Sequence, residues 1–243
     1  MLTQDLPIFI GLSILSEILG TVGGFGSSVF FVPMANYFMD FQTVLGLTAL
    51  FHLSSNISKI GFFRKGFDKK LVLTLGIPAV VFVSIGAFLS KFLNPTFLTL
   101  ALAAFLIIFS LVFIIMKELK IMPTTKNAII GGTFSGLIAG LLGTGGAIRG
   151  ATMSAFDLKK DQFIATSAII DLGIDLSRSI IYSYNGFVKK EVFYLIPILF
   201  IIGIIGTYLG KRILDRITQE QFKRFVLFLI LAIGVSTLVL NYR

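Results

Sequence analysis

The chain has 243 residues, of which 56% are hydrophobic and only 14% charged, and its mean hydropathy is +0.95. Soluble domains have an apolar share nearer half and a charged share nearer a quarter, so this composition excludes an ordinary water-soluble domain. The net charge of +9 does not indicate nucleic-acid binding, because the basic residues form short clusters between apolar segments. The sequence contains no cysteine, which excludes disulfides, thiolate metal sites and redox pairs.

Apolar runs follow one another along the chain, and we expect each to be a membrane helix. About 20 residues of helix cross a hydrocarbon core of about 30 Å, and unpaired backbone amides exclude irregular structure in lipid. The sequence therefore predicts an all-α polytopic protein of the cell membrane. Its runs are 18–39, 41–58, 71–90, 96–116, 127–148, 162–188, 192–210 and 225–242, two of them (41–58 and 162–188) interrupted by polar residues.

The two halves of the chain repeat each other at an offset of 119 or 120 positions. Gly20-Thr-Val-Gly-Gly-Phe-Gly26 matches Gly140-Leu-Leu-Gly-Thr-Gly-Gly146, and Ile77-Pro78 matches Ile196-Pro197. Several matches in one register argue against coincidence. We therefore expect two tandem repeats of four segments each, 1–120 and 121–243, within one membrane domain.

Each repeat has a glycine cluster inside its first apolar run. Glycine lowers helix stability by about 1 kcal/mol relative to alanine, so the clusters predict a helix broken into two halves. The second halves, beginning near Ser27 and near Gly146, would direct free amides and partial positive charge into the membrane, where they attract anions. Broken segments in matching positions are typical of transporter binding sites; the alternative is that the glycines only permit close helix packing. The clusters are Gly23, Gly24 and Gly26, and Gly143, Gly145 and Gly146.

Basic residues in the loops indicate how the broken segments run. If all eight segments cross the membrane, ten basic residues lie on one side and eight on the other. If the broken segments enter and return on the same side, the split becomes fourteen to four, the asymmetry of the positive-inside rule. This predicts inverted repeats with re-entrant first segments and both termini outside. The fourteen cytoplasmic residues would be Arg64, Lys65, Lys69, Lys70, Lys117, Lys120, Lys126, Lys159, Lys160, Lys211, Arg212, Arg216, Lys223 and Arg224.

A polar triplet recurs in matching helices, with spacing i, i+4, i+7 that places its side chains on one helical face. Three unpaired charges in the second triplet would cost on the order of 10 kcal/mol in lipid. One interpretation is that Asp175 and Arg178 form a structural ion pair at i, i+3. We favour a shared anion site, because the first triplet has no carboxylate of its own to pair with Lys59. The triplets are His52, Asn56 and Lys59, and Asp171, Asp175 and Arg178.

Roles follow from the chemistry of these side chains. Lys59 and Arg178 would attract the anion, and Arg149 is either a third ligand or an interfacial charge that snorkels to the membrane surface. Neutral hydrogen bonds would come from Asn56, Ser27, Ser28, Thr144 and the glycine amides. The candidates for a coupling proton are His52, Asp171, Asp175 and Glu17, although His52 could equally serve helix packing. We predict no catalytic residue, no metal site and no cofactor.

The broken segments resemble those of the sulfite exporter TauE/SafE family of membrane permeases, the toluene-sulfonate uptake group. The resemblance rests on the two glycine clusters, on Val32-Pro33 after the first, and on short basic loops after the second segments. It covers nearly the whole chain and implies transport of small sulfur-containing anions such as sulfite and sulfonates. Phe25 and Ala147 interrupt the family's run of three glycines, and the bulkier Phe25 would reshape the site.

These observations predict a secondary transporter of small anions, coupled to protons, whose partners are the anion and the lipid bilayer and not nucleic acid; a homo-oligomer is compatible with the sequence. A passive anion channel is the alternative, since it would use the same cations without needing His52 or Asp171. A membrane aspartyl protease is disfavoured, because Asp171 and Asp175 share one helix whereas a catalytic dyad converges on one proton. We therefore do not expect an enzyme.

Overall fold

Helices dominate the computed structural model, which describes residues 5–24, 26–116, 121–216 and 219–241, with side chains described up to residue 216 and from 226 to 240. No strand occurs in these ranges, as the apolar runs predict. In chain order the elements are α1 (Leu6–Gly23), α2 (Ser28–Ala35), α3 (Phe41–Phe62), α4 (Lys69–Leu71), η2 (Val72–Gly76), α5 (Ile77–Leu89), η3 (Ser90–Phe92), α6 (Pro95–Ile115), α7 (Thr125–Leu142), α8 (Gly146–Met153), η4 (Ser154–Phe156), α9 (Lys160–Tyr184), η5 (Lys190–Val192), α10 (Leu195–Leu214) and α11 (Gln219–Asn241).

Four helical stretches of the described residues are long and apolar enough to cross a membrane. Helices α3 and α9, of 22 and 25 residues, are also long enough to cross, but they carry the two polar triplets, which lower their hydropathy. The protein is therefore an integral membrane protein in which two of the longest helices are partly polar. The four stretches are Leu6–Gly23, Lys69–Phe92, Pro95–Ile115 and Leu195–Leu214.

The glycine clusters end one helix and precede the next in both halves of the chain. Gly24 and Gly143 cap α1 and α7 with left-handed backbone, at φ of +71° and +76°, a conformation that a β-carbon disfavours. Helices α2 and α8 then begin at Ser28 and Gly146. The first broken segment is longer than expected, because α1 begins at Leu6 and not near Ile18.

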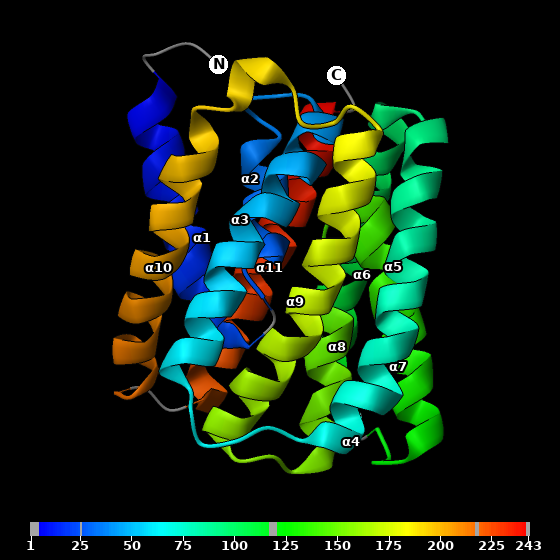
Figure 1. Cartoon of the computed structure of the whole chain (residues 1–243), viewed down its shortest axis with the longest axis vertical. Helices are drawn as coiled ribbons and strands as arrows, with labels where there is room; N and C mark the ends of the chain where they lie inside the picture. Colours follow the sequence, from blue (N-terminus) through cyan, green and yellow to red (C-terminus); the bar gives the residue numbers. More distant parts are fainter. Residues whose placement is uncertain (1–4, 25, 117–120, 217–218, 242–243) are drawn as a thin grey trace.

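Matching helices run in opposite directions in Figure 1. Helix α1 descends from the end of the molecule that carries both termini, α2 turns back toward that end, and α3 then descends through the whole molecule. Helix α7 rises from the other end, α8 turns back toward it, and α9 rises through the whole molecule. The two breaks therefore meet in the interior from opposite ends.

Glycines also permit a close approach between α7 and the helix formed by η2 and α5. Gly132, Gly136 and Gly140 stand one turn apart, and a β-carbon on each would overlap a backbone carbonyl of the facing helix. The three carbonyls belong to Leu75, Ala79 and Val83. Close packing by small residues, which is common between membrane helices, thus coexists in this protein with the helix breaks.

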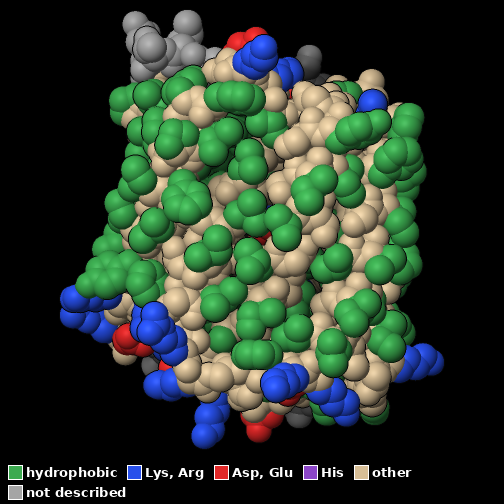
Figure 2. Space-filling model, viewed as in Figure 1, with side chains coloured by type: hydrophobic (Ala, Val, Ile, Leu, Met, Phe, Trp, Pro, Cys, Tyr) green, Lys and Arg blue, Asp and Glu red, His purple; other side chains and the backbone are tan. Residues whose placement is uncertain are grey.

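Apolar side chains cover the middle of the molecule and basic ones collect at one end, which we call the basic end (Figure 2). This is the lower end in Figure 1, where α3 leads to α4 and where α9 begins. The opposite end carries Lys91, Lys189 and Lys190. Lys117, Lys120, Lys223, Arg224 and Arg243 lie outside the described side chains. Those described at the basic end are Arg64, Lys65, Lys69, Lys70, Lys126, Lys159, Lys160, Lys211, Arg212 and Arg216.

Candidate functional site

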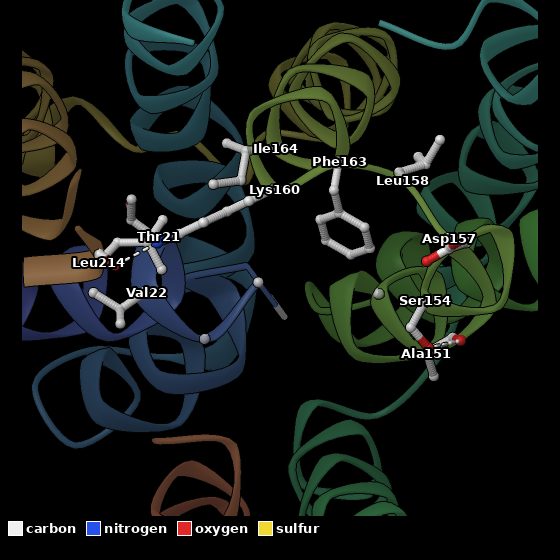
Figure 3. Close-up of a pocket in the computed structure, with 13 residues that line it drawn as sticks. Thr21, Val22, Ala151, Ser154, Asp157, Leu158, Lys160, Phe163, Ile164 and Leu214 are labelled. Carbon is white, nitrogen blue, oxygen red and sulfur yellow. Dashed lines mark hydrogen bonds between the residues drawn. The ribbon is translucent and has the colours of Figure 1, made fainter. Parts of the chain in front are cut away.

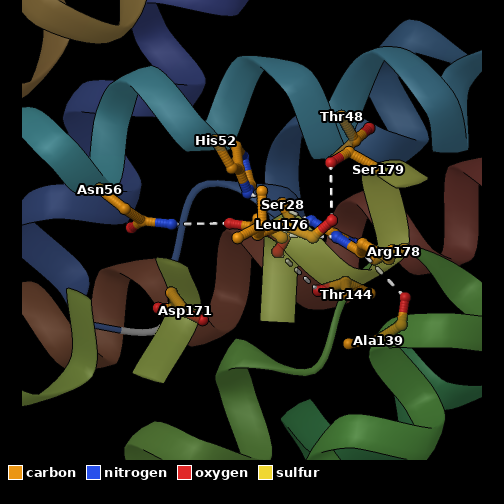
Figure 4. A network of polar contacts seen from close by, with 12 residues as sticks. Ser28, Thr48, His52, Asn56, Ala139, Thr144, Asp171, Leu176, Arg178 and Ser179 are labelled. Carbon is orange, nitrogen blue, oxygen red and sulfur yellow. Dashed lines mark hydrogen bonds and ion pairs between the residues drawn. The ribbon is translucent and has the colours of Figure 1, made fainter. Parts of the chain in front are cut away.

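The two polar triplets meet in the interior, because α3 packs against α9. The amide Nδ2 of Asn56 donates a hydrogen bond of 2.6 Å to Oδ2 of Asp175, its matching residue 119 positions later. Both side chains are buried, at 3% and 2% exposure, and Figure 4 shows Asn56 reaching across between the helices. The recurrent polar faces therefore form one buried cluster.

Arg178 is bound on two sides. Its guanidinium contacts Oδ1 of Asp175 through Nε and Nη2, both at 2.7 Å, so the i, i+3 ion pair considered in the sequence does form. Its Nη1 donates to the carbonyl of Gly143 at 2.7 Å, where α7 ends. A cation at a helix C-terminus is stabilised by the helix dipole and by the free carbonyls there. Arg178 therefore also anchors the break between α7 and α8.

Lys59 pairs with a carboxylate that lies outside both triplets, on α1. Its Nζ lies 2.8 Å from Oε1 of Glu17, and Glu17 is fully buried. The hydroxyls of Ser27, Ser55, Thr21 and Thr207 also donate to Glu17. The first triplet has no carboxylate of its own, as the sequence indicates, but α1 supplies one from outside the triplet, so Lys59 is not left unpaired.

Arg149 forms the third ion pair. Its Nη1 and Nη2 each lie 2.5 Å from one carboxylate oxygen of Asp171, the two-pronged geometry in which arginine binds carboxylates most strongly. Its Nε donates to Ser167 at 3.1 Å. Arg149 is only 2% exposed, so the alternative of a snorkelling interfacial charge was wrong.

His52 lies between the two halves of the cluster. Its Nε2 is 3.0 Å from the hydroxyl of Ser27, and its Nδ1 is 3.5 Å from Nη2 of Arg178. Nearby, Ser28 donates a hydrogen bond of 3.3 Å to Thr144, and Figure 4 shows this contact beside His52. Ser28 is the first residue of α2, and Thr144 lies between α7 and α8, so the two helix breaks contact each other directly.

A small cavity of about 20 Å³ lies among these groups, enough for roughly one water molecule. We call this cavity and its lining the site. Of the residues singled out in the sequence, Gly23, Gly24, Glu17 and Thr144 do not line the site: Glu17 lies behind Lys59, and Thr144 behind Ser28. Those that line it are Gly26, Ser27, Ser28, His52, Asn56, Lys59, Gly143, Gly145, Gly146, Arg149, Asp171, Asp175 and Arg178.

The charges of the site balance. Lys59, Arg149 and Arg178 are each within 2.8 Å of a carboxylate oxygen, and the three carboxylates belong to Glu17, Asp171 and Asp175. Single buried ions are costly, whereas paired and hydrogen-bonded ions are tolerated. The cations that the sequence offered as free anion ligands are therefore all engaged in the structure.

A larger cavity of about 300 Å³, which we call the vestibule, opens between the two helix breaks near the basic end. Gly23, Gly24, Ser154, Asp157 and Lys160 are among its lining residues, and Figure 3 shows the ring of Phe163 projecting into it. A smaller cavity of about 20 Å³ continues inward from Phe163 to Lys59 and Asp171; we call it the connecting cavity. Neighbouring cavities that share lining residues therefore lead from the basic end past Phe163 toward the site.

Three contributors were missed in the sequence. Ser55 and Ser167 stand four residues before Lys59 and Asp171 and contact them, so the i, i+4 spacing of helix neighbours could have revealed them. Phe163 carried no such signal, because an aromatic residue in an apolar run is indistinguishable from one that faces lipid.

Two comparisons with known proteins bear on this geometry. The family model described as sulfite exporter TauE/SafE matches residues 9–237, a range that includes every ion pair of the site. A comparison with curated proteins gives no match.

Proposed function

Because the chain belongs to the sulfite exporter TauE/SafE family, we propose that it is a secondary transporter that carries small sulfur-containing oxyanions, such as sulfite and sulfonates, across the cell membrane. Membership of the family makes it a membrane transporter of sulfite or related anions. One observation carries the proposal: Lys59, Arg149 and Arg178 converge on one buried cavity where two helices begin.

The chemistry of the site suits an oxyanion. Two guanidinium groups offer planar forks of N–H donors that match pairs of oxygens on sulfite or a sulfonate. The cavity is also bordered by Ser28 and Gly146, the first residues of α2 and α8, and helix N-termini bind anions through their free amides and dipole.

The proposal includes an inverted repeat with α1–α2 and α7–α8 as re-entrant pairs and the basic end in the cytoplasm. Three observations support it: the register of the glycine clusters, the opposite directions of matching helices in Figure 1, and the collection of basic side chains at one end. In transporters with this symmetry, one repeat rocks against the other around a fixed central site.

Alternating access agrees better with the cavities than a passive channel does. The vestibule of about 300 Å³ has room for an oxyanion, whereas the site, at about 20 Å³, has room for roughly one water molecule. Side chains must therefore move before an anion can enter the site. An open channel would instead need a continuous path wide enough for the anion along its whole length.

Proton coupling completes the proposal. Together with Glu17 behind Lys59, the site holds three cations and three carboxylates, so an added oxyanion would leave an uncompensated negative charge in a medium of low dielectric constant. A proton that enters with the anion restores the balance. The groups positioned to accept it are Glu17, His52, Asp171 and Asp175.

Uptake into liposomes containing the purified protein tests this function. We expect saturable uptake of sulfite or a sulfonate, faster with an inward proton gradient, and weaker binding in Arg149→Gln and Lys59→Gln variants. Lys65→Gln is the matched control, because Lys65 is exposed and pairs with Asp161 away from the site. Uptake that does not saturate and ignores the gradient would favour a channel, and wild-type binding in both site variants would contradict the proposed anion site.

A further inference from the structure

The cation of the Arg149–Asp171 pair, unlike Lys59 and Arg178, has no basic counterpart in the other repeat. Asn56 and Asp175 match each other at an offset of 119, and so do Lys59 and Arg178. Arg149 and Asp171 are matched in the first repeat by Val29 and His52, which cannot form an ion pair with each other. This pair is thus an addition specific to the second repeat.

Outside its ion pair, the carboxylate of Asp171 has the weakest support of the three. Glu17 accepts from four hydroxyls besides Lys59. Asp175 accepts from Asn56 and from Arg178, which is itself fixed to the end of α7. Asp171 has, besides Arg149, a single contact of 3.4 Å from Ser167. Withdrawing Asp171 therefore breaks fewer interactions than withdrawing Glu17, and its one contact outside the ion pair is longer than the 2.6 Å bond from Asn56 to Asp175.

Asp171 also lies on the route from the vestibule. It lines both the site and the connecting cavity that begins at Phe163. Its side chain is 18% exposed, compared with 0% for Glu17 and 3% for Asp175. An anion and a proton that arrive from the basic end therefore encounter this carboxylate before the other two.

On the basis of the transport function proposed above, we propose that the Arg149–Asp171 pair is the exchangeable element of the site: the oxyanion replaces the carboxylate of Asp171 on the guanidinium of Arg149, and Asp171 takes up a proton from the vestibule. The two other pairs stay closed and hold the helices in place. A singly charged oxyanion such as a sulfonate brings one negative charge and the proton removes one from Asp171, so the net charge does not change.

The charges around Asp171 fit this exchange. Arg149 approaches from α8 and Lys59 from α3, while Arg178 and Asp175 lie further along α9. His52 of α3 also lines the cavity. Of the three cations, Arg149 is bound to Asp171, and the other two keep their own carboxylates during the exchange. Arg149 is thus the ligand that becomes available.

Proton uptake by the wild-type protein gives the first test. Purified protein in weakly buffered detergent solution is mixed with sulfite, or with methanesulfonate, whose single charge does not change near neutral pH. We expect one proton to be taken up for each methanesulfonate bound, and the dissociation constant to rise about tenfold per pH unit. Methanesulfonate binding without proton uptake would overturn the exchange while leaving anion transport intact.

The Asp171→Asn variant gives the second test, because its amide imitates a protonated carboxyl group. We expect it to bind methanesulfonate without proton uptake and with little pH dependence, and to exchange anions without accumulating them in response to a proton gradient. The control Asp161→Asn removes a carboxylate at the basic end, outside the site, and should retain proton uptake. Persistent uptake in Asp171→Asn would overturn the inference, whereas absence of oxyanion binding in the wild type would overturn the proposed function itself.

Discussion

Asn56 donates a hydrogen bond to Asp175, and these two residues hold the same position in the two halves of the chain. In a molecule built from two related halves, a residue that contacts its own counterpart lies close to the axis that relates them. Under the inverted repeat proposed above, the contact would place the buried cluster where the halves meet. This position lets a movement of one half against the other alter the site directly.

Substitution of either residue of this contact should destabilise the fold, and substitution of Asp175 should do so more than substitution of Asn56. Asn56→Ala removes one buried donor from Asp175 and should lower the free energy of unfolding by about 1–3 kcal/mol. Asp175→Ala leaves the guanidinium of Arg178 without its carboxylate and should cost about 3–5 kcal/mol. Thermal and denaturant unfolding in detergent measure both, and a larger effect for Asn56→Ala would contradict this account of the pair.

The Lys59–Glu17 pair should show strong coupling. Lys59→Met or Glu17→Gln alone leaves a buried charge without its partner and should destabilise by about 3–5 kcal/mol. The double variant should cost less than the sum of the two, because neither charge remains. The same cycle on the pair Lys65–Asp161, in which Lys65 is exposed and Asp161 is partly exposed, is the control, with an expected coupling of about 1 kcal/mol or less. Additive effects in the buried cycle would mean that the two side chains do not interact.

The sequence contains no cysteine, so a thiol reagent labels only a cysteine that has been introduced. Single introduced cysteines can therefore determine which end of the protein faces the cytoplasm. Ser154 lines the vestibule and is exposed, whereas Thr96 is exposed near the opposite end. A membrane-impermeant thiol reagent should therefore modify Ser154→Cys from the cytoplasm and Thr96→Cys from outside. Labelling of both from the same side would exclude the proposed arrangement.

Phe163 should control access from the vestibule to the site. It lines both the vestibule and the connecting cavity, and Ser167 lies just beyond it in the connecting cavity. The introduced thiol of a Ser167→Cys variant should react slowly with a small thiol reagent. The same thiol should react several-fold faster in a double variant that also carries Phe163→Ala. Equal rates would show that the ring does not obstruct the route.

The second helix break should tolerate no side chain at Gly145. A β-carbon there would overlap the backbone of Ser135 and press on the side chain of Ala139, so Gly145→Ala should destabilise by about 1–3 kcal/mol. Gly11 in α1 has nothing within 4 Å of such an atom, so Gly11→Ala should be neutral or slightly stabilising. Temperature-dependent size-exclusion chromatography compares the two variants.

Sequence reasoning identified those features that depend on neighbours along the chain. The breaks after Gly23 and after Leu142 follow from local glycine preference, and the shared face of Asn56 and Lys59 follows from helical spacing. The start of α1 at Leu6 was missed, because Ser13, Ser16 and Glu17 interrupt the apolar run and become buried only against other helices.

The pairing within the site depended on contacts between helices and could not be read from the sequence. Glu17 has Leu137 at its matching position, so the repeat gave no indication of its role. It reaches Lys59 because α1 packs closely on α10, where Gly206 leaves space for the Glu17 side chain. Arg149 likewise finds Asp171 only after α8 turns back from the break.

The balance of three cations by three carboxylates has a consequence for energetics in a living cell. Moving one elementary charge across a membrane costs or releases about 2.3 kcal/mol per 100 mV. An empty site whose charges cancel does no net electrical work when it changes the side that it faces. The return of the unloaded protein should therefore be insensitive to voltage, so that its speed is set by packing and solvation alone.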